Sequence, residues 1–236
     1  GSLANQGVLC EASVFESLEE TLRYAQAAGI PKVLRWVQRQ RKSYFQKGEG
    51  LMQPLRIALT KGRLEKSTVA LLEQTGMDCS QLRDKGRRLI LPVGDGSLQA
   101  VLAKAADVIT YVEHGVCDMG VVGKDTIMEN GSHFFEILDL GFGRCGFALA
   151  APKGSNFYGG YRAKTIATKY PNVARRFFES KQMDVRIIKI EGSVELAPLL
   201  GLSDGIVDIV ETGATLRENG LEVVEPIHQV SARLIV

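Results

Sequence analysis

The sequence has few of the residues that build metal centres or disulfide frameworks. It holds 4 cysteines and 3 histidines in 236 residues. The cysteines, at positions 10, 79, 117 and 145, never have the Cys-x-x-Cys spacing of a zinc site or redox motif. A structural zinc ion or a set of disulfides is therefore not expected, and the reduced cytoplasm is the expected location.

Strong net charge and long apolar runs are also missing. Lysine and arginine number 29 and aspartate and glutamate 27, so the formal net charge is only +2. This balance gives no electrostatic argument for nucleic-acid binding. No apolar run approaches the ~18 residues that a transmembrane helix needs. Small anionic substrates therefore fit this composition better than DNA or a membrane.

What the sequence does contain is an alternation of strand and helix patterns. Short apolar runs such as 55–59 and 206–210 end at turns, and amphipathic stretches such as 65–75 follow them. This alternation is typical of α/β proteins. Because 45% of the residues are hydrophobic, the chain can bury two modest cores, and two α/β lobes are predicted.

Residues 1–52 differ from the rest of the chain. Strand-like, helix-like and strand-like stretches follow one another there, as in a small βαβ unit. A basic run from Arg39 to Lys47 and a Gly48-Glu49-Gly50 linker come next. We interpret residues 1–52 as an N-terminal appendage.

The most informative stretch is 204–216. Residues 206–210 are typical of a buried strand, and Glu211-Thr212-Gly213-Ala214-Thr215 then forms a turn before a short helix. Backbone N–H groups at such a turn bind anions, which makes it a candidate phosphate site. Asp208 and Glu211 are candidates to accept hydrogen bonds from sugar hydroxyls or to hold Mg²⁺. The pattern indicates a ribose 5-phosphate site; an ordinary strand-to-helix connection with a threonine N-cap is the alternative.

Two basic clusters are candidate contacts for a polyphosphate. Lys61-Gly62-Arg63 follows the strand 55–59, at the carboxyl end where open α/β sheets bind ligands. The second cluster lies before the strand 89–93 and contains Arg83, Lys85, Arg87 and Arg88. Together the clusters suit a triphosphate. The alternative for each is a set of solvated surface cations.

The ordered set of motifs from about Leu55 to Val236 resembles the ATP phosphoribosyltransferases that begin histidine biosynthesis. The motifs that carry the resemblance are residues 59–64, 118–125, 162–171, 192–198, 208–216 and 218–220. The resemblance implies two periplasmic-binding-protein-like α/β lobes with the active site in the cleft between them. Lobe I is expected to comprise 53–143 and 226–236, and lobe II 144–225 with a loop that binds phosphoribosyl diphosphate (PRPP).

The implied reaction joins N1 of the ATP adenine to C1 of PRPP, giving N1-(5-phosphoribosyl)-ATP and pyrophosphate, with Mg²⁺ as cofactor. Catalysis then rests on positioning and electrostatics and needs no protein nucleophile. The expected PRPP contacts are Asp208, Glu211, Thr212, Gly213, Ala214, Thr215 and Glu195. The expected ATP or pyrophosphate contacts are Lys61, Gly62, Arg63, Arg83 and Arg88. The alternative function is that of a two-lobed small-anion binding protein without catalysis.

The resemblance covers the catalytic lobes and no C-terminal regulatory domain, which implies the short form of the enzyme. That form is typically a hetero-oligomer with a regulatory subunit resembling histidyl-tRNA synthetase. Residues 1–52 lie outside the resemblance. Two accounts of them stay open: a remnant of a fusion to that subunit, or a lineage-specific extension.

Overall fold

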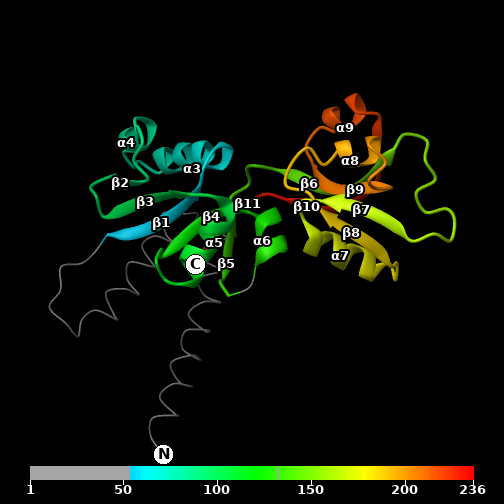
Figure 1. Ribbon diagram of the computed structural model, residues 1–236. Coiled ribbons are helices and arrows are strands. Elements are labelled where there is room, and N and C mark those ends of the chain that lie inside the picture. The colour runs from blue at the N-terminus through cyan, green and yellow to red at the C-terminus, as the bar shows by residue number, and fades with distance from the viewer. Residues whose placement is uncertain (1–53, 132) are drawn as a thin grey trace, which may run out of the picture. The chain divides into compact units, whose positions relative to one another are not determined.

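The computed structural model describes residues 54–131 and 133–236, so the expected appendage 1–52 lies outside the described residues. These residues form two compact α/β units, which confirms the predicted class (Figure 1). Unit 1 comprises 54–122, 133–140 and 233–236, and unit 2 comprises 123–131 and 141–232. No helix in the described ranges is long and apolar enough to cross a membrane.

Unit 1 is built on a six-stranded sheet. Its strands are β1 (Leu55–Thr60), β2 (Ile90–Val93), β3 (Leu98–Ala103), β4 (Met119–Gly123), β5 (Glu136–Asp139) and β11 (Ala232–Ile235). Its helices are α3 (Arg63–Gln74), α4 (Ser80–Arg83) and α5 (Ala105–Glu113). The strand order is β2-β3-β1-β4-β11-β5. β1 pairs in parallel with both β3 and β4, so the middle of the sheet is parallel.

The carboxyl end of β1 is held firmly. Ile57, Ala58 and Leu59 are completely buried, as expected for a strand inside a parallel sheet that is covered on both faces. The Thr60 hydroxyl donates a hydrogen bond to the Val121 carbonyl oxygen of β4 at 2.9 Å. The segment 61–63 therefore begins from a fixed point of the sheet.

Unit 2 is built on a five-stranded sheet. Its strands are β6 (Cys145–Pro152), β7 (Lys164–Thr168), β8 (Val185–Lys189), β9 (Gly205–Val210) and β10 (Leu221–Val230). Its helices are α6 (Lys124–Asn130), α7 (Pro171–Ser180), α8 (Leu196–Leu199) and α9 (Ala214–Glu218). The strand order is β10-β6-β9-β7-β8. β9 lies in the middle, antiparallel to β6 and parallel to β7.

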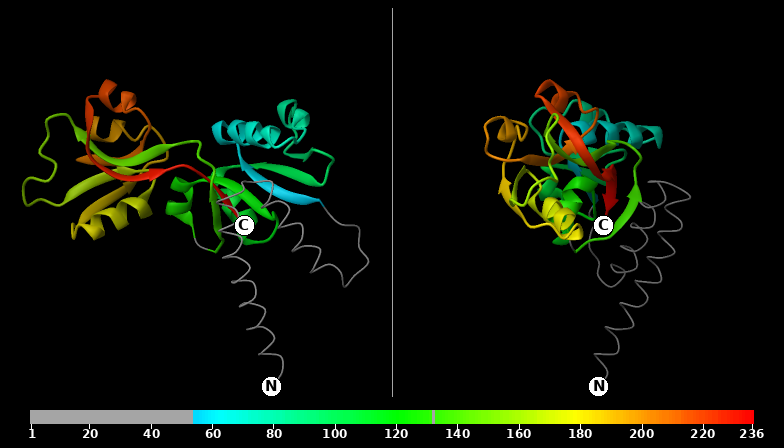
Figure 2. Two further views of the ribbon diagram at one scale, coloured as in Figure 1. Left: turned by 180° about the vertical axis from the view of Figure 1, so that it is seen from behind. Right: turned by 90° about the vertical axis from the view of Figure 1, so that its right-hand side faces the viewer.

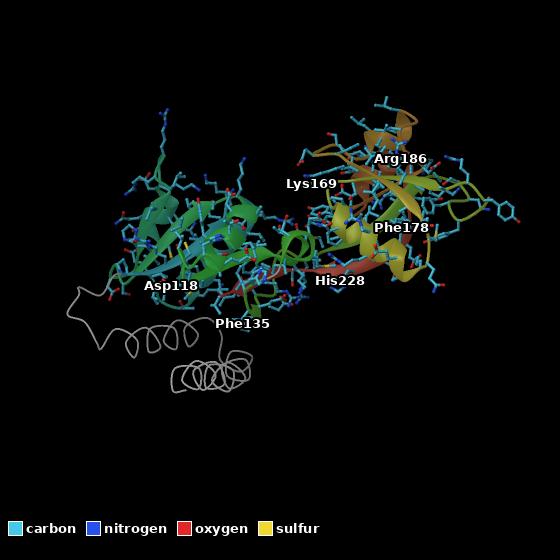
Figure 3. The ribbon with its side chains drawn as sticks, turned by 60° about the horizontal axis from the view of Figure 1, so that its bottom comes forward. Asp118, Phe135, Lys169, Phe178, Arg186 and His228 are labelled. Carbon is cyan, nitrogen blue, oxygen red and sulfur yellow. The ribbon has the colours of Figure 1, made fainter. Side chains whose placement is uncertain are left out.

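Helices cover both faces of this sheet. Alternate residues of a strand face opposite sides, so Val207 packs with Phe178 of α7, whereas Ile206 packs with Ala197 of α8 and Leu216 of α9. Figures 1 and 2 show α7 on one side of the sheet and α8 and α9 on the other, and Figure 3 labels Phe178. The strand that precedes the candidate phosphate turn is thus packed from both sides.

The division into units differs from the expected lobe boundaries at three places. The sequence analysis assigns residues 226–236 to lobe I, but β10 pairs with β6 in unit 2, and the division falls after Ala232. Residues 123–131 and 141–143, also expected in lobe I, belong to unit 2. The hydrophobic pattern identifies a strand or helix, but the partner against which it packs is decided by contacts distant in sequence.

Helix α6 belongs to unit 2 because it caps α7. The Glu129 carboxylate accepts hydrogen bonds from the Asn172 N–H at 3.0 Å and the Val173 N–H at 3.1 Å. The Asn172 side-chain amide donates to the Glu129 carbonyl oxygen at 3.0 Å. Tyr170, the N-cap residue of α7, makes no capping bond with its own side chain. Glu129 therefore supplies to the first turn of α7 the acceptor that a local N-cap normally provides.

We expect Glu129→Ala to lower the free energy of unfolding by about 1–2 kcal/mol, because two amides at the start of α7 lose their acceptor. Urea unfolding followed by circular dichroism measures this change. Glu179→Ala is the control, since Glu179 is exposed on α7. This substitution should change the free energy of unfolding by no more than about 0.5 kcal/mol. Equal losses in the two variants would contradict the capping role of Glu129.

Candidate functional site

The turn after β9 is the first part of the candidate site. β9 ends at Val210, and α9 begins at Ala214 with Gly213 as its N-cap residue. Gly213 has φ 70°, a left-handed conformation in which a side chain is strained. Thr212, Ala214 and Thr215 are exposed. The turn therefore presents two hydroxyls and small side chains at the surface, as the sequence predicts.

Internal hydrogen bonds shape this turn without using most of its amides. The Ala214 N–H donates to Thr212 Oγ1 at 3.3 Å, and Arg217 Nη1 donates to the Thr212 carbonyl oxygen at 3.1 Å. Within residues 54–131 and 133–236, the amides of Thr212, Gly213 and Thr215 donate no hydrogen bond. Backbone donors left in this way at the start of a helix are available to an anion.

The second part of the site is a set of carboxylates beside the turn. Asp208 is half-buried near the end of β9, and its Oδ1 accepts the Ile209 N–H at 2.8 Å. Burial raises the pKa of Asp208; the Ile209 amide opposes this, the nearby Glu195 carboxylate adds to it, and Lys169 opposes it. The net pKa is raised. The hydrogen bond from the Ile209 N–H therefore does not fully offset the cost of burying the ionised Asp208 carboxylate.

Glu195 and Glu211 differ in their setting. Glu195 is the half-buried N-cap residue of α8, near enough to Asp208 to influence its pKa. Glu211 is exposed in the turn itself. Lys169, labelled in Figure 3, is exposed just after β7 and favours the charged form of Asp208. The structure thus brings Glu195 near Asp208 from a segment that precedes β9.

Tyr170 joins this group, although the sequence analysis assigns it no role. Its ring packs edge-on against Phe147, with the ring centroids 4.9 Å apart. Its hydroxyl donates to Asp125 Oδ2 of α6 at 3.3 Å. Burial, followed by the carboxylates of Asp125 and Asp208, raises the pKa of Tyr170, so the phenol stays protonated. The signal in the sequence is the position of Asp125 and Tyr170 inside two of the motifs, 118–125 and 162–171.

In unit 1 the two basic clusters lie beside one another. Lys61 and Arg63 are exposed on either side of Gly62, which has φ 99°. The buried Glu65 joins the clusters, because its carboxylate accepts the Gly62 N–H at 3.3 Å and forms an ion pair with Lys85. The segment 61–63 and the second cluster therefore form one basic edge of unit 1, an arrangement that the sequence alone leaves open.

Arg83 and Arg88 are engaged with protein partners. Arg83 forms a two-point ion pair with Glu73 of α3, at 2.6 and 2.5 Å. Arg88 donates to the Gln81 side chain at 3.1 Å and to the Asp84 carbonyl oxygen at 2.9 Å. These contacts use part of the donor set of each guanidinium. Their assignment to ATP or pyrophosphate stays a prediction.

The carboxylates near the turn fit a magnesium ion that arrives together with its substrate. The described ranges contain no group of three or more His, Cys, Asp or Glu side chains that could hold a metal ion. Mg²⁺ keeps several waters and is commonly bound by one or two carboxylates together with substrate phosphates. Asp208 and Glu195 supply carboxylates of that kind.

Comparisons with known proteins identify the family. A family model described as ATP phosphoribosyltransferase matches residues 104–236. An ATP phosphoribosyltransferase from Clostridium kluyveri is 60% identical over 182 residues, covering 77% of this chain and 83% of that protein. The ATP phosphoribosyltransferase of Clostridium acetobutylicum is 57% identical over 182 residues, covering 77% and 85%.

Solved structures agree with these relatives. The ATP phosphoribosyltransferase (HisG:HisZ) complex from Thermotoga maritima matches with a TM-score of 0.65 and 38% identity, covering 77% of this chain and 86% of that chain. A Xanthomonas citri protein solved with bound ATP shares the fold, with a TM-score of 0.52 at 12% identity and coverage of 78% and 77%. Fold, turn and relatives together define an α/β pentosyltransferase, an enzyme of the glycosyltransferase class. The chain belongs to the ATP phosphoribosyltransferase family.

Asp208→Asn should reveal the cost of ionising a buried carboxylate. Because the folded-state pKa of Asp208 is raised, its ionised form destabilises the folded protein, and this destabilisation grows as the pH rises through the ordinary aspartate range toward the raised value. We therefore expect Asp208→Asn to melt at a higher temperature than the wild type at pH 7. The difference should shrink as the pH falls toward about 4. Differential scanning calorimetry over this pH range measures it.

Asp204→Asn is the control with the opposite sign. Burial disfavours the ionised form of Asp204, but the Thr165 N–H at 2.8 Å and the Arg162 guanidinium outweigh it and hold the pKa of Asp204 below its ordinary value. Its ionisation therefore stabilises the fold above the ordinary aspartate pKa. Asp204→Asn should melt at a lower temperature at pH 7. Shifts of the same sign in both variants would refute the contrast between the two sites.

Proposed function

We propose that this chain transfers the 5-phosphoribosyl group of PRPP to N1 of the adenine ring of ATP. A bond from N1 to C1 of the ribose forms as the bond from C1 to the pyrophosphate oxygen breaks. The products are N1-(5-phosphoribosyl)-ATP and pyrophosphate. The observation that carries the proposal is the exposed turn 212–215 beside Asp208 in a member of this family; the amides of Thr212, Gly213 and Thr215 in this turn donate no hydrogen bond to another described residue.

The turn is assigned to the 5-phosphate of PRPP. The amides of Gly213 and Thr215 and the hydroxyls of Thr212 and Thr215 are donors on a small, exposed surface. A hydrogen bond to a charged group contributes about 1.5–3 kcal/mol, so several donors together can hold a phosphate. The left-handed Gly213 supports this assignment because it lets the backbone approach a ligand closely.

The carboxylates are assigned to the hydroxyls of the ribose. Asp208 has a raised pKa because burial is incompletely offset by donors. A ribose hydroxyl that donates to Asp208 would supply what the ionised carboxylate lacks. Glu211 and Glu195 are proposed to accept the remaining hydroxyl contacts. Acceptors on neighbouring hydroxyls would orient C1 for attack, and such positioning is a large part of catalysis between two bound substrates.

The basic edge of unit 1 is assigned to polyphosphate groups. Lys61 and Arg63 are exposed at the carboxyl end of β1, and Gly62 permits close approach of the backbone. Cations fixed in this way stabilise the charge that develops on a departing pyrophosphate. Arg83 and Arg88 contribute to the same positive field while they remain paired with their protein partners.

Mg²⁺ is the proposed cofactor. Asp208 and Glu195 are the carboxylates that would hold it, together with oxygen atoms of PRPP. When bound, the ion neutralises charge on the pyrophosphate and so makes it a better leaving group. The protein residues position the sugar and the nucleotide.

A regulatory chain is the proposed partner. The Thermotoga maritima relative was solved as a complex of HisG with HisZ. We propose that this chain is a short-form catalytic subunit and that it assembles in the same manner with a subunit resembling histidyl-tRNA synthetase. The proposed location of this complex is the cytoplasm. The described ranges contain no candidate membrane span that would argue otherwise.

The alternative function, a small-anion binding protein without chemistry, is not favoured. Relatives of 57–60% identity are transferases. Mixing the purified chain with ATP, PRPP and Mg²⁺ and measuring pyrophosphate separates the two functions. The assay should be run with and without the regulatory partner, because activity that appears only in the complex still supports the enzyme.

The double variant Thr212→Ala/Thr215→Ala should raise the Michaelis constant for PRPP about 10-fold or more, the effect of losing at least one hydrogen bond to a charged group. The constant for ATP should change far less. Steady-state kinetics with each substrate varied in turn measures both. Thr110→Ala, an exposed threonine on α5 of unit 1, is the control and should change neither. Equal effects on PRPP and ATP would remove the phosphate assignment of the turn.

Arg63→Ala should weaken the binding of ATP and of the product pyrophosphate by roughly 10-fold, because it removes a charged hydrogen-bond donor. Inhibition by pyrophosphate and the Michaelis constant for ATP measure this loss. Lys66→Ala removes an exposed cation from the same helix and should leave both constants unchanged. A large drop in the melting temperature of Arg63→Ala would instead assign Arg63 a structural role.

A further inference from the structure

Glu65, in the first turn of α3, is buried although it carries a charge. It is 5% exposed, and among the described residues it is the one Asp, Glu, Lys or Arg side chain that is buried. Burying an ionised carboxylate is costly unless it is paired and hydrogen-bonded. A first-turn glutamate can interact with the helix dipole from the surface, so the dipole does not explain why Glu65 is buried.

The two partners of the Glu65 carboxylate come from the two basic clusters. Its Oε2 accepts the Gly62 N–H at 3.3 Å, and its Oε1 forms an ion pair with Lys85 Nζ. Each oxygen therefore faces a donor of the protein, and the side chain is almost inaccessible to solvent. Glu65 is thus placed to act through these partners rather than on a ligand.

Gly62 explains why α3 needs an acceptor from within the helix. It is the N-cap residue of α3 and has φ 99°, a conformation that residues with a side chain rarely adopt. The usual capping residues, such as serine and aspartate, would be strained at this position. Glu65, three residues further on, accepts the Gly62 N–H instead, as the glutamate of a capping box does.

The backbone between β1 and α3 is held at three points. The Lys61 N–H donates to the Ala103 carbonyl oxygen of β3 at 2.9 Å, and the Gly62 carbonyl oxygen accepts the Lys66 N–H at 3.2 Å. The bond from the Gly62 N–H to Glu65 is the third. The exposed cations of this segment therefore project from a rigid support, as a binding site requires.

Lys85 connects the second cluster to the same carboxylate. Its ammonium is held by Glu65, and its carbonyl oxygen accepts the Arg88 N–H at 3.1 Å and Arg88 Nε at 3.3 Å. Helices α3 and α4 lie on the same face of the unit 1 sheet (Figure 1). One buried carboxylate therefore ties the turn 85–88 to Gly62.

We infer that Glu65 is a positioning residue that sets the spacing between segment 61–63 and turn 85–88 for a pyrophosphate or triphosphate group. Anionic oxygens follow one another at fixed distances along a polyphosphate, so cations from two segments bind it together only if the segments are held at a matching spacing. Buried ionic groups are retained in some proteins because they specify one arrangement. The inference rests on the proposed function, which takes the basic edge as the polyphosphate site.

A double-mutant cycle on the full chain tests the inference, with isothermal titration calorimetry of pyrophosphate as the measurement. Glu65→Gln keeps an oxygen for the Gly62 N–H but loses the ion pair, and Lys85→Met removes the ammonium. Each single variant should bind pyrophosphate about 10-fold more weakly, because each releases the same turn. The double variant Glu65→Gln/Lys85→Met should also bind about 10-fold and not about 100-fold more weakly, since all three variants lose one and the same connection.

The melting temperature separates positioning from a general loss of structure. Lys85→Met leaves the Glu65 carboxylate buried without its counter-ion, so it should melt at a lower temperature than the wild type. The double variant removes both charges and should regain the melting temperature, whereas its pyrophosphate affinity should stay low. The matched control is Glu136→Gln, which removes one carboxylate from an ion pair with Arg233 in unit 1 and should leave pyrophosphate affinity unchanged.

Four results would overturn the inference: a wild type that binds no pyrophosphate, wild-type affinity in Glu65→Gln, additive losses in the double variant, or a control that loses affinity equally. Tighter binding by Glu65→Gln with weaker binding by Lys85→Met would also overturn it and make Lys85 a direct contact. A double variant that regains affinity together with its melting temperature would assign Glu65 a purely structural role.

The binding measurement is independent of product formation from ATP and PRPP, which tests the proposed function. An active wild type whose three variants all bind pyrophosphate normally would remove this inference alone, and an inactive wild type would remove the proposed function. If Lys85→Met fails to fold by circular dichroism, equal and weakened affinities of Glu65→Gln and the double variant support the inference, and unequal ones contradict it.

Discussion

The pairing of β9 between β6 and β7 is the constraint on which the candidate site depends. Residues 206–210 are paired with β6 on one edge, and Gly205, Ile206 and Val207 are paired with β7 on the other. Both faces are packed by helices. A strand held on four sides cannot slide in register without exposing its apolar residues. The end of β9, and with it the turn 211–215, is therefore fixed relative to the sheet.

One buried hydroxyl connects this strand to the neighbouring polar group. Thr168 at the end of β7 donates to the Val207 carbonyl oxygen of β9 at 2.6 Å and accepts the Tyr170 N–H at 2.9 Å. Tyr170 in turn reaches Asp125 of α6, and α6 caps α7 through Glu129. Buried hydrogen bonds of this kind are costly to leave unmade, so the chain of contacts holds Tyr170 and Asp208 in one arrangement.

The buried carboxylate of Asp208 lowers the stability of the fold and at the same time suits a binding site. Asp208 is buried enough for its pKa to rise, which lowers the stability of the folded chain at neutral pH. A buried carboxylate with a raised pKa is typical of a binding or catalytic site, where a ligand can donate further hydrogen bonds to it. In unit 1 the arrangement is different: Glu65 and Glu73 pair with Lys85 and Arg83, while Lys61 and Arg63 stay exposed.

The sequence by itself determined the α/β class, the strand 206–210, the small-residue turn after it and the basic segment 61–63, because local periodicity and turn chemistry encode each of them. Only the tertiary structure decided that β10 pairs with β6, that Glu129 caps α7 from 43 residues away, and that Lys85 meets Glu65 while Arg83 is drawn to Glu73. The physical reason is that packing and long-range hydrogen bonds select these partners from many side chains of the same chemical type, and no local pattern distinguishes among them.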